Sequence, residues 1–110
     1  MLKTAVKTIS LFAIFISFLF SQTSGKISGK IIDVSNDQPL VGANVIITQT
    51  QAGISADEDG YFNLINVSPG KYSVKAMMIG YETVNIEDVI VSVNRTTSLD
   101  IKMKQSIVEG

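Results

Sequence analysis

Residues 57–78 read DEDGYFNLINVSPGKYSVKAMM and contain two apolar–polar alternations separated by turn-forming residues. The first alternation is Tyr61–Val67, with Phe62 and Leu64 on one face, and the second is Lys71–Met78. A period of two residues is typical of β-strands. Between them, Ser68-Pro69-Gly70 is a strong turn signal, and Pro69-Gly70 fits the centre of a type II turn with Gly at the positive-φ place. The stretch therefore predicts two strands joined by a tight turn.

The same two-residue period extends from this stretch in both directions. Further short runs are predicted at residues 26–32, 43–48, 53–56, 83–93 and 98–103, with turn-forming residues between them. No window from residue 26 onward has the period of a helix, so six to seven short strands with frequent turns indicate a β-sandwich or a small barrel. The residues predicted to face the core are Ile27, Ile31, Val45, Ile47, Phe62, Leu64, Tyr72, Val74, Ala76, Val84, Ile86, Val91, Leu99 and Ile101.

The composition excludes most catalytic chemistry. The chain has 110 residues and contains no Cys, no His and no Trp. The lack of Cys removes disulfides, thiolate nucleophiles and Fe–S clusters, and the lack of His removes Ser-His-Asp triads and nearly every Zn, Cu or non-haem Fe site. Nine basic residues against ten acidic ones, without a basic run, argue against nucleic acid as a partner. We therefore expect a protein that is not an enzyme.

The first residues have the pattern of a secretory signal peptide. Lys3 and Lys7 precede the uncharged segment Ile9–Phe20, and small polar residues follow it. This segment of twelve residues is too short to span a membrane, which needs ~20 apolar residues. We expect a signal peptide over residues 1–21, cut somewhere in residues 21–25; a retained anchor or a buried helix is the alternative. After its removal seven basic residues face ten acidic ones, and the exported chain has no membrane span of its own.

The order of five short motifs is more specific than the fold class. They are Gly29-Lys30-Ile31-Ile32-Asp33, Gln38-Pro39-Leu40-Val41-Gly42-Ala43-Asn44-Val45, Asp57-Glu58-Asp59-Gly60-Tyr61-Phe62, Val67-Ser68-Pro69-Gly70-Lys71-Tyr72 and Ile79-Gly80-Tyr81. Together they resemble the carboxypeptidase regulatory-like domain over residues 25–103. The resemblance implies an all-β, seven-stranded antiparallel transthyretin-like sandwich, with residues 104–110 beginning a linker. The residues of these motifs also have roles in the fold. Gly60, for example, suits a backbone conformation that a Cβ would disfavour.

The resemblance also implies a cellular context. In bacteria, similar domains stand after a signal peptide and ahead of a TonB-dependent outer-membrane receptor, and residues 106–110 resemble the connection toward the plug. The implied location is the periplasm or outer membrane of a Gram-negative-type bacterium. The implied partners are the rest of a longer receptor chain or another envelope protein. A free-standing adhesion or assembly domain and a carbohydrate-binding module of similar fold are the alternatives.

Candidate sites are few. Asp57, Glu58 and Asp59 form an acidic cluster, but the ligand spacing of a Ca²⁺ loop is missing, so a solvated hairpin turn is favoured. Sugar sites present exposed aromatic rings, whereas Tyr61 and Tyr81 are expected to cover core edges and Phe62 and Tyr72 to point inward. We predict no catalytic, cofactor-binding or metal-binding residues and no cofactor.

Overall fold

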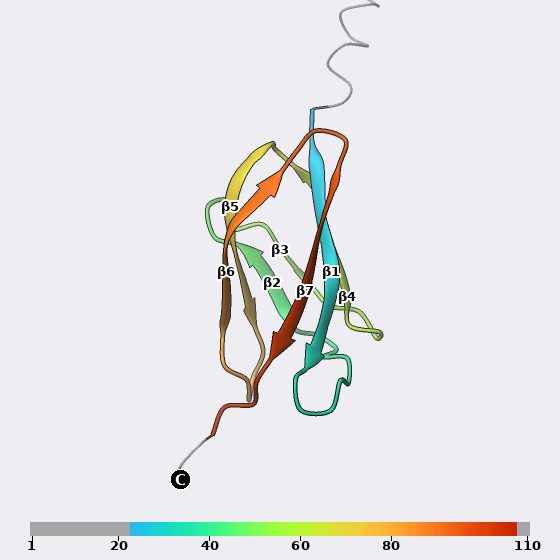
Figure 1. Cartoon of the computed structure of the whole chain (residues 1–110), viewed down its shortest axis with the longest axis vertical. Helices are drawn as coiled ribbons and strands as arrows, with labels where there is room; N and C mark the ends of the chain where they lie inside the picture. Colours follow the sequence, from blue (N-terminus) through green and yellow to red (C-terminus); the bar gives the residue numbers. More distant parts are fainter. Residues whose placement is uncertain (1–22, 108–110) are drawn as a thin grey trace, which may run out of the picture.

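The computed structural model describes residues 23–107, which form seven β-strands in two facing sheets (Figure 1). The strands are β1 (Gly25–Asp33), β2 (Asn44–Ile47), β3 (Gly53–Ser55), β4 (Tyr61–Val67), β5 (Gly70–Met77), β6 (Val84–Val91) and β7 (Thr96–Met103). The described range contains no helix, so the all-β fold is confirmed. The predicted leader, residues 1–21, and residues 108–110 lie outside the described residues.

The two sheets have the strand orders β4-β1-β7 and β3-β2-β5-β6. The expectation of an antiparallel sandwich is wrong at one pair, because β1 and β7 run parallel from Lys26 beside Thr96 to Asp33 beside Met103. The other strand pairs are antiparallel. Alternation shows which face a side chain occupies but not the direction of the neighbouring strand. The first and last strands could therefore not be oriented from the sequence.

Two of the predicted turns carry the chain from one sheet to the other. β3 and β4 belong to different sheets, so the turn at residues 57–60 is not the hairpin turn that was expected. Gly60 has the expected positive φ of 80°. In the second turn, between β4 and β5, Gly70 is not among the positive-φ residues, and Asn66, with φ 56°, has the left-handed conformation instead. Gly70 instead opens β5 and pairs with Val91, which requires an extended backbone.

The core lies between the two sheets. Ten of the predicted core residues are buried, while Tyr72, Val84, Ile86 and Leu99 are half-buried and pack against the others. Three of these four lie on β6 or β7, the edge strands, which have a paired neighbour on one side only. The core also includes residues absent from the predicted set, namely Leu40, Ala43, Ala56, Val67, Val89 and Met103.

Gly29 lets two neighbours approach the middle of β1. A Cβ at this position would lie 1.6 Å from the carbonyl oxygen of Leu99 and 3.1 Å from Cζ of Phe62. The buried Phe62 ring therefore lies beside a backbone without a side chain. Because successive inward positions of β1 are Ile27, Gly29, Ile31 and Asp33, the last inward side chain of this strand is a carboxylate.

Candidate functional site

The carboxylate of Asp33 is the one charged group that is buried among the described residues, with 1% of the residue exposed. Oδ1 accepts hydrogen bonds from the backbone N–H of Ser35 at 2.8 Å and from its hydroxyl at 2.6 Å. Oδ2 accepts from the hydroxyl of Tyr81 at 2.7 Å and from Nε2 of Gln105 at 3.0 Å. The cluster of Asp33, Ser35, Tyr81 and Gln105, here called the Asp33 network, joins the end of β1 to two distant segments of the chain.

The electrostatics of the Asp33 network keep the carboxylate ionised. The hydroxyl of Ser35, the hydroxyl of Tyr81, the backbone N–H of Ser35 and the amide of Gln105 together hold the pKa of Asp33 well below its usual range. The hydrogen bond to Asp33 in turn raises the pKa of Tyr81. A carboxylate with four donors and a lowered pKa is unsuited to proton transfer near neutral pH. This network is therefore structural.

Tyr81 was expected to cover a core edge, and the structure confirms that its ring packs against the core at one end of the sandwich. Asp33, by contrast, was missed as a buried group. The signal was present in the sequence, because Asp33 continues the inward series of Ile27 and Ile31 at the two-residue period. The carboxylate was overlooked because charged residues are rarely fully buried unless they are paired.

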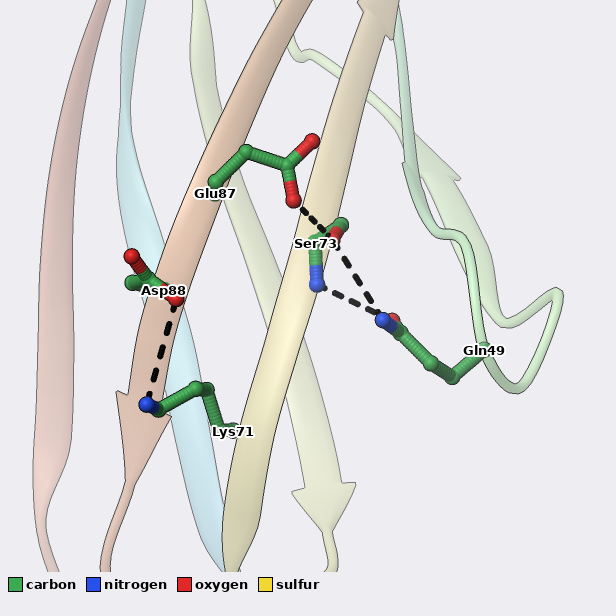
Figure 2. A network of polar contacts seen from close by, with 5 residues as sticks. All are labelled: Gln49, Lys71, Ser73, Glu87 and Asp88. Atoms are coloured by element: carbon green, nitrogen blue, oxygen red, sulfur yellow. Dashed lines mark hydrogen bonds and ion pairs between the residues drawn. The ribbon is translucent and has the colours of Figure 1, made fainter.

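A second polar network lies on the outer surface of the β3-β2-β5-β6 sheet (Figure 2). Ser73 on β5 donates its hydroxyl to Glu87 at 2.5 Å and its backbone N–H to Oε1 of Gln49 at 2.9 Å. Nε2 of Gln49 donates to the Ser73 hydroxyl at 3.3 Å, and Lys71 lies 3.9 Å from Asp88. These five residues, here called the bulge network, are exposed or half-exposed.

The bulge network follows an irregularity in β6. Tyr72 pairs with Val89 while Val74 pairs with Ile86, so Glu87 and Asp88 together lie opposite Ser73. Asp88 has φ 57°, the left-handed conformation that an extra residue in a strand can adopt. The inserted residue also changes which residues of β6 face inward, from Val84 and Ile86 to Val89 and Val91, and of these four the predicted core omits Val89. The network ties β6 to β5 and to the turn after β2.

The outer surface of the β4-β1-β7 sheet carries the most exposed of the described aromatic rings. Tyr61 is 50% exposed, contrary to the expectation that it covers a core edge. It pairs with Lys30, whose Nζ lies 5.2 Å from the ring centroid, and Lys30 pairs on its other side with Asp100. An adjacent row holds Asn63, Ser28 and Ser98, and the two rows line a shallow hollow. These six residues are here called the Tyr61 face.

The acidic cluster at residues 57–59 is used by the local backbone. Oδ1 of Asp57 accepts from the N–H of Asp59 and from the N–H of Tyr61, both at 2.9 Å. This is the Asp-centred turn chemistry that places aspartate in tight turns. Within residues 23–107 no group of three or more His, Cys, Asp or Glu residues is arranged to hold a metal ion. That no residue is catalytic or binds a cofactor stays a prediction.

The apolar residues that alternate with polar ones on the outer surfaces lie opposite polar residues of the neighbouring strands. Ile32 lies on β1, whereas Ile46, Met77 and Ile90 lie on strands of the other sheet. Ile46 pairs with Lys75 and Ile90 with Lys71, so polar side chains separate them. Among the described residues, no helix has the length and apolar character needed to cross a bilayer.

Comparison with solved structures identifies the same architecture elsewhere. A chain of a type II cohesin–X–dockerin complex from Acetivibrio cellulolyticus is 29% identical, with a TM-score of 0.63, and the match covers 72% of this chain and 56% of that one. The Bacillus anthracis TIE protein is 21% identical (TM-score 0.59; 76% of this chain, 17% of that one). The minor pilin GBS52 of Streptococcus agalactiae is 14% identical (TM-score 0.60; 81% and 48%).

These likenesses differ in what they establish. The chain spans little more than half the length of the cohesin–X–dockerin chain, and at 14–21% identity the other two show the fold alone. No curated protein sequence matches the chain. The family of the carboxypeptidase regulatory-like domain, however, matches residues 26–104, which include β2 to β7 and all but the first residue of β1. The chain therefore belongs to the carboxypeptidase regulatory-like domain family.

Proposed function

We propose that the chain is a non-catalytic, exported module that forms the N-terminal periplasmic extension of a TonB-dependent outer-membrane receptor. Its location is the periplasmic side of the outer membrane in a Gram-negative-type bacterium. The family supports a non-catalytic role, because the matched domain is described as regulatory-like. The signal-peptide pattern of residues 1–21 supports export.

The observation that carries the proposal is the position of the two ends of the sandwich. Because β1 and β7 are parallel neighbours, the chain reaches β1 at one end of the sandwich and leaves β7 at the opposite end (Figure 1). A domain with this arrangement holds its N-terminus apart from the segment that follows it. That arrangement suits a spacer between an exported N-terminus and a receptor plug.

Two experiments test the proposal. The reading frame downstream of Gly110 in the source genome is expected to encode a plug and then a barrel pattern of alternating strands of ~10 residues. A stop codon there would favour the free-standing adhesion or assembly domain. N-terminal sequencing of the protein from a bacterial periplasm is expected to find a start between Gln22 and Lys26, and Met1 on cytoplasmic protein would refute export.

Carbohydrate binding is the second candidate, and the Tyr61 face is the observation that favours it. A half-exposed ring beside amide, hydroxyl, ammonium and carboxylate groups offers both stacking and hydrogen bonds to a sugar. Glycan-array binding that is lost in Tyr61→Ala but kept in Ile90→Ala, on the opposite sheet, would support this candidate. Absence of binding by the unmodified chain, or equal binding by both variants, would eliminate the Tyr61 face as the site.

A further inference from the structure

The two strands that connect the domain to the rest of its chain lie side by side. β1 and β7 are parallel and in register over eight consecutive pairs, from Lys26 beside Thr96 to Asp33 beside Met103. Backbone bonds continue the pairing at both ends: the N–H of Lys26 donates to the carbonyl of Arg95 at 3.1 Å, and the N–H of Val34 donates to the carbonyl of Met103 at 2.9 Å. Figure 1 shows β1 starting at the end of the molecule opposite to that where β7 finishes.

This arrangement determines how the fold responds to tension. When the chain is pulled from both sides, β1 and β7 are drawn past each other along their own length. The interstrand hydrogen bonds lie roughly across the direction of the force, so all of them are loaded together. A pair of strands pulled apart from one end instead loses its bonds one after another. From this geometry we propose that the sandwich is mechanically strongest along this axis, so that it withstands force applied between its N-terminal and C-terminal ends better than force that peels β1 from β7.

The Asp33 network reinforces the C-terminal side of this strand pair. Gln105, two residues past β7, donates to the carboxylate at the end of β1, and this bond therefore bridges the two loaded strands directly. Tyr81 holds the same carboxylate from the loop between β5 and β6. The segment after β7 is also bonded to that loop, by the N–H of Glu82 to the carbonyl of Lys104 and by the N–H of Ser106 to the carbonyl of Gly80.

The N-terminal side of the strand pair has its own hydrogen bond, and the packing between the sheets opposes sliding of β1 along β7. The N–H of Asn94 donates to the carbonyl of Ser24 at 3.0 Å, just outside the paired region. A shift of β1 by one residue would turn the buried Ile27 and Ile31 toward solvent and place a side chain where Gly29 now meets Leu99. Slippage without unfolding is therefore disfavoured. This inference does not depend on what precedes or follows the domain.

Single-molecule force measurements test the inference directly, because the chain has no native Cys and introduced pairs define the pulling points. Thr23→Cys with Ile107→Cys pulls β1 and β7 lengthwise past each other, and both positions are exposed. Thr23→Cys with Arg95→Cys places both handles before their strands and peels β1 from β7. At one pulling speed we expect the lengthwise pair to unfold at a force higher by about twofold or more, since forced unfolding follows the unfolding rate.

A substitution within the Asp33 network separates this role from general stability. In the lengthwise geometry, Gln105→Ala is expected to lower the unfolding force, and in the peeling geometry it is expected to leave the force unchanged. Thermal unfolding of every double-Cys protein checks that the folds are equally stable before they are pulled. Equal unfolding forces in the two geometries, or an equal effect of Gln105→Ala in both, would overturn the inference. Neither result would bear on the receptor proposal, which the downstream reading frame tests.

Discussion

The Asp33 network and the bulge network use similar groups in opposite surroundings. In both, a carboxylate accepts from a serine hydroxyl and the side-chain amide of a glutamine belongs to the network. Asp33 is buried, and its donors come from segments up to 72 residues away. The ion pair of the bulge network has side chains that are 66% and 80% exposed, on adjacent strands. The difference between the two networks is therefore access to water.

Access to water decides what each network contributes. A buried carboxylate that loses its partners remains without water to replace the missing bonds. An exposed group exchanges a protein partner for a water molecule at little net cost. The Asp33 network therefore holds the end of the sandwich together, whereas the bulge network selects the local conformation of β6.

Removal of the buried carboxylate is expected to have the largest effect. Asp33→Ala leaves the hydroxyl of Tyr81 and the amide of Gln105 without their acceptor and releases the segment after β7. The loss in the free energy of unfolding should exceed that of Val74→Ala, a fully buried position for which about 1–3 kcal/mol is expected. Urea unfolding measures both. Asp59→Ala, in an exposed turn, is the control and should be nearly neutral. A loss no larger than the control's would contradict the structural role of Asp33.

Removal of one donor is expected to have a smaller effect that depends on location. Tyr81→Phe deletes the hydroxyl that donates to Asp33 and keeps the ring in the core. Tyr72→Phe deletes a hydroxyl that donates at 2.6 Å to the carbonyl of Ser68 in an exposed setting. We expect Tyr81→Phe to lower the melting temperature clearly more than Tyr72→Phe. Equal melting temperatures of the two variants would contradict the view that burial of the acceptor determines the loss of stability.

The pH dependence of stability should report the contribution of the Asp33 network. The pKa of Asp33 is lowered in the folded protein by its hydrogen-bond donors, so the unfolded state binds the proton more readily. The contribution of Asp33 is thus fully present above its unfolded pKa of about 4 and is lost as the pH falls below that value. Urea unfolding between neutral pH and the acid range should show this loss, reduced in Gln105→Ala. Parallel pH profiles of the two proteins would contradict it.

The fold could be predicted from the sequence to the extent that it depends on alternation. Phe62, Val74 and Ile101 are buried because each lies at an inward position of a two-residue repeat. The parallel pairing of β1 with β7 could not be predicted, because the partners are about 70 residues apart and the pattern of neither strand carries its direction. The change of face within β6 is contained in the predicted core, which names Ile86 and then Val91, but the inserted residue at Glu87-Asp88 that causes it is seen only in the pairing with β5.

The candidate sites were harder to predict than the fold. The chemistry of Asp33 depends on Tyr81 and Gln105, which reach it only through the packing of distant segments. Tyr61 was expected at a core edge because the strand pattern does not show whether an outward side chain is covered by another part of the chain or faces solvent. Its exposure follows from its outward position on β4, on the face opposite to Phe62 and Leu64.

The smallest effect is expected at the ion pair of the bulge network. Lys71 and Asp88 are 3.9 Å apart and largely exposed, so their attraction is screened by water and salt, and holding two flexible side chains together costs entropy. Lys71→Ala and Asp88→Ala form a double-mutant cycle with the doubly substituted protein. The coupling free energy should be below about 0.5 kcal/mol and should decrease further in high salt. Asp88→Ala alone also forces alanine into a left-handed backbone, and the cycle removes this contribution because it is common to both Asp88 variants. A coupling well above that limit would mean that the ion pair fixes the bulge, and that an exposed network can hold this fold as the buried one does.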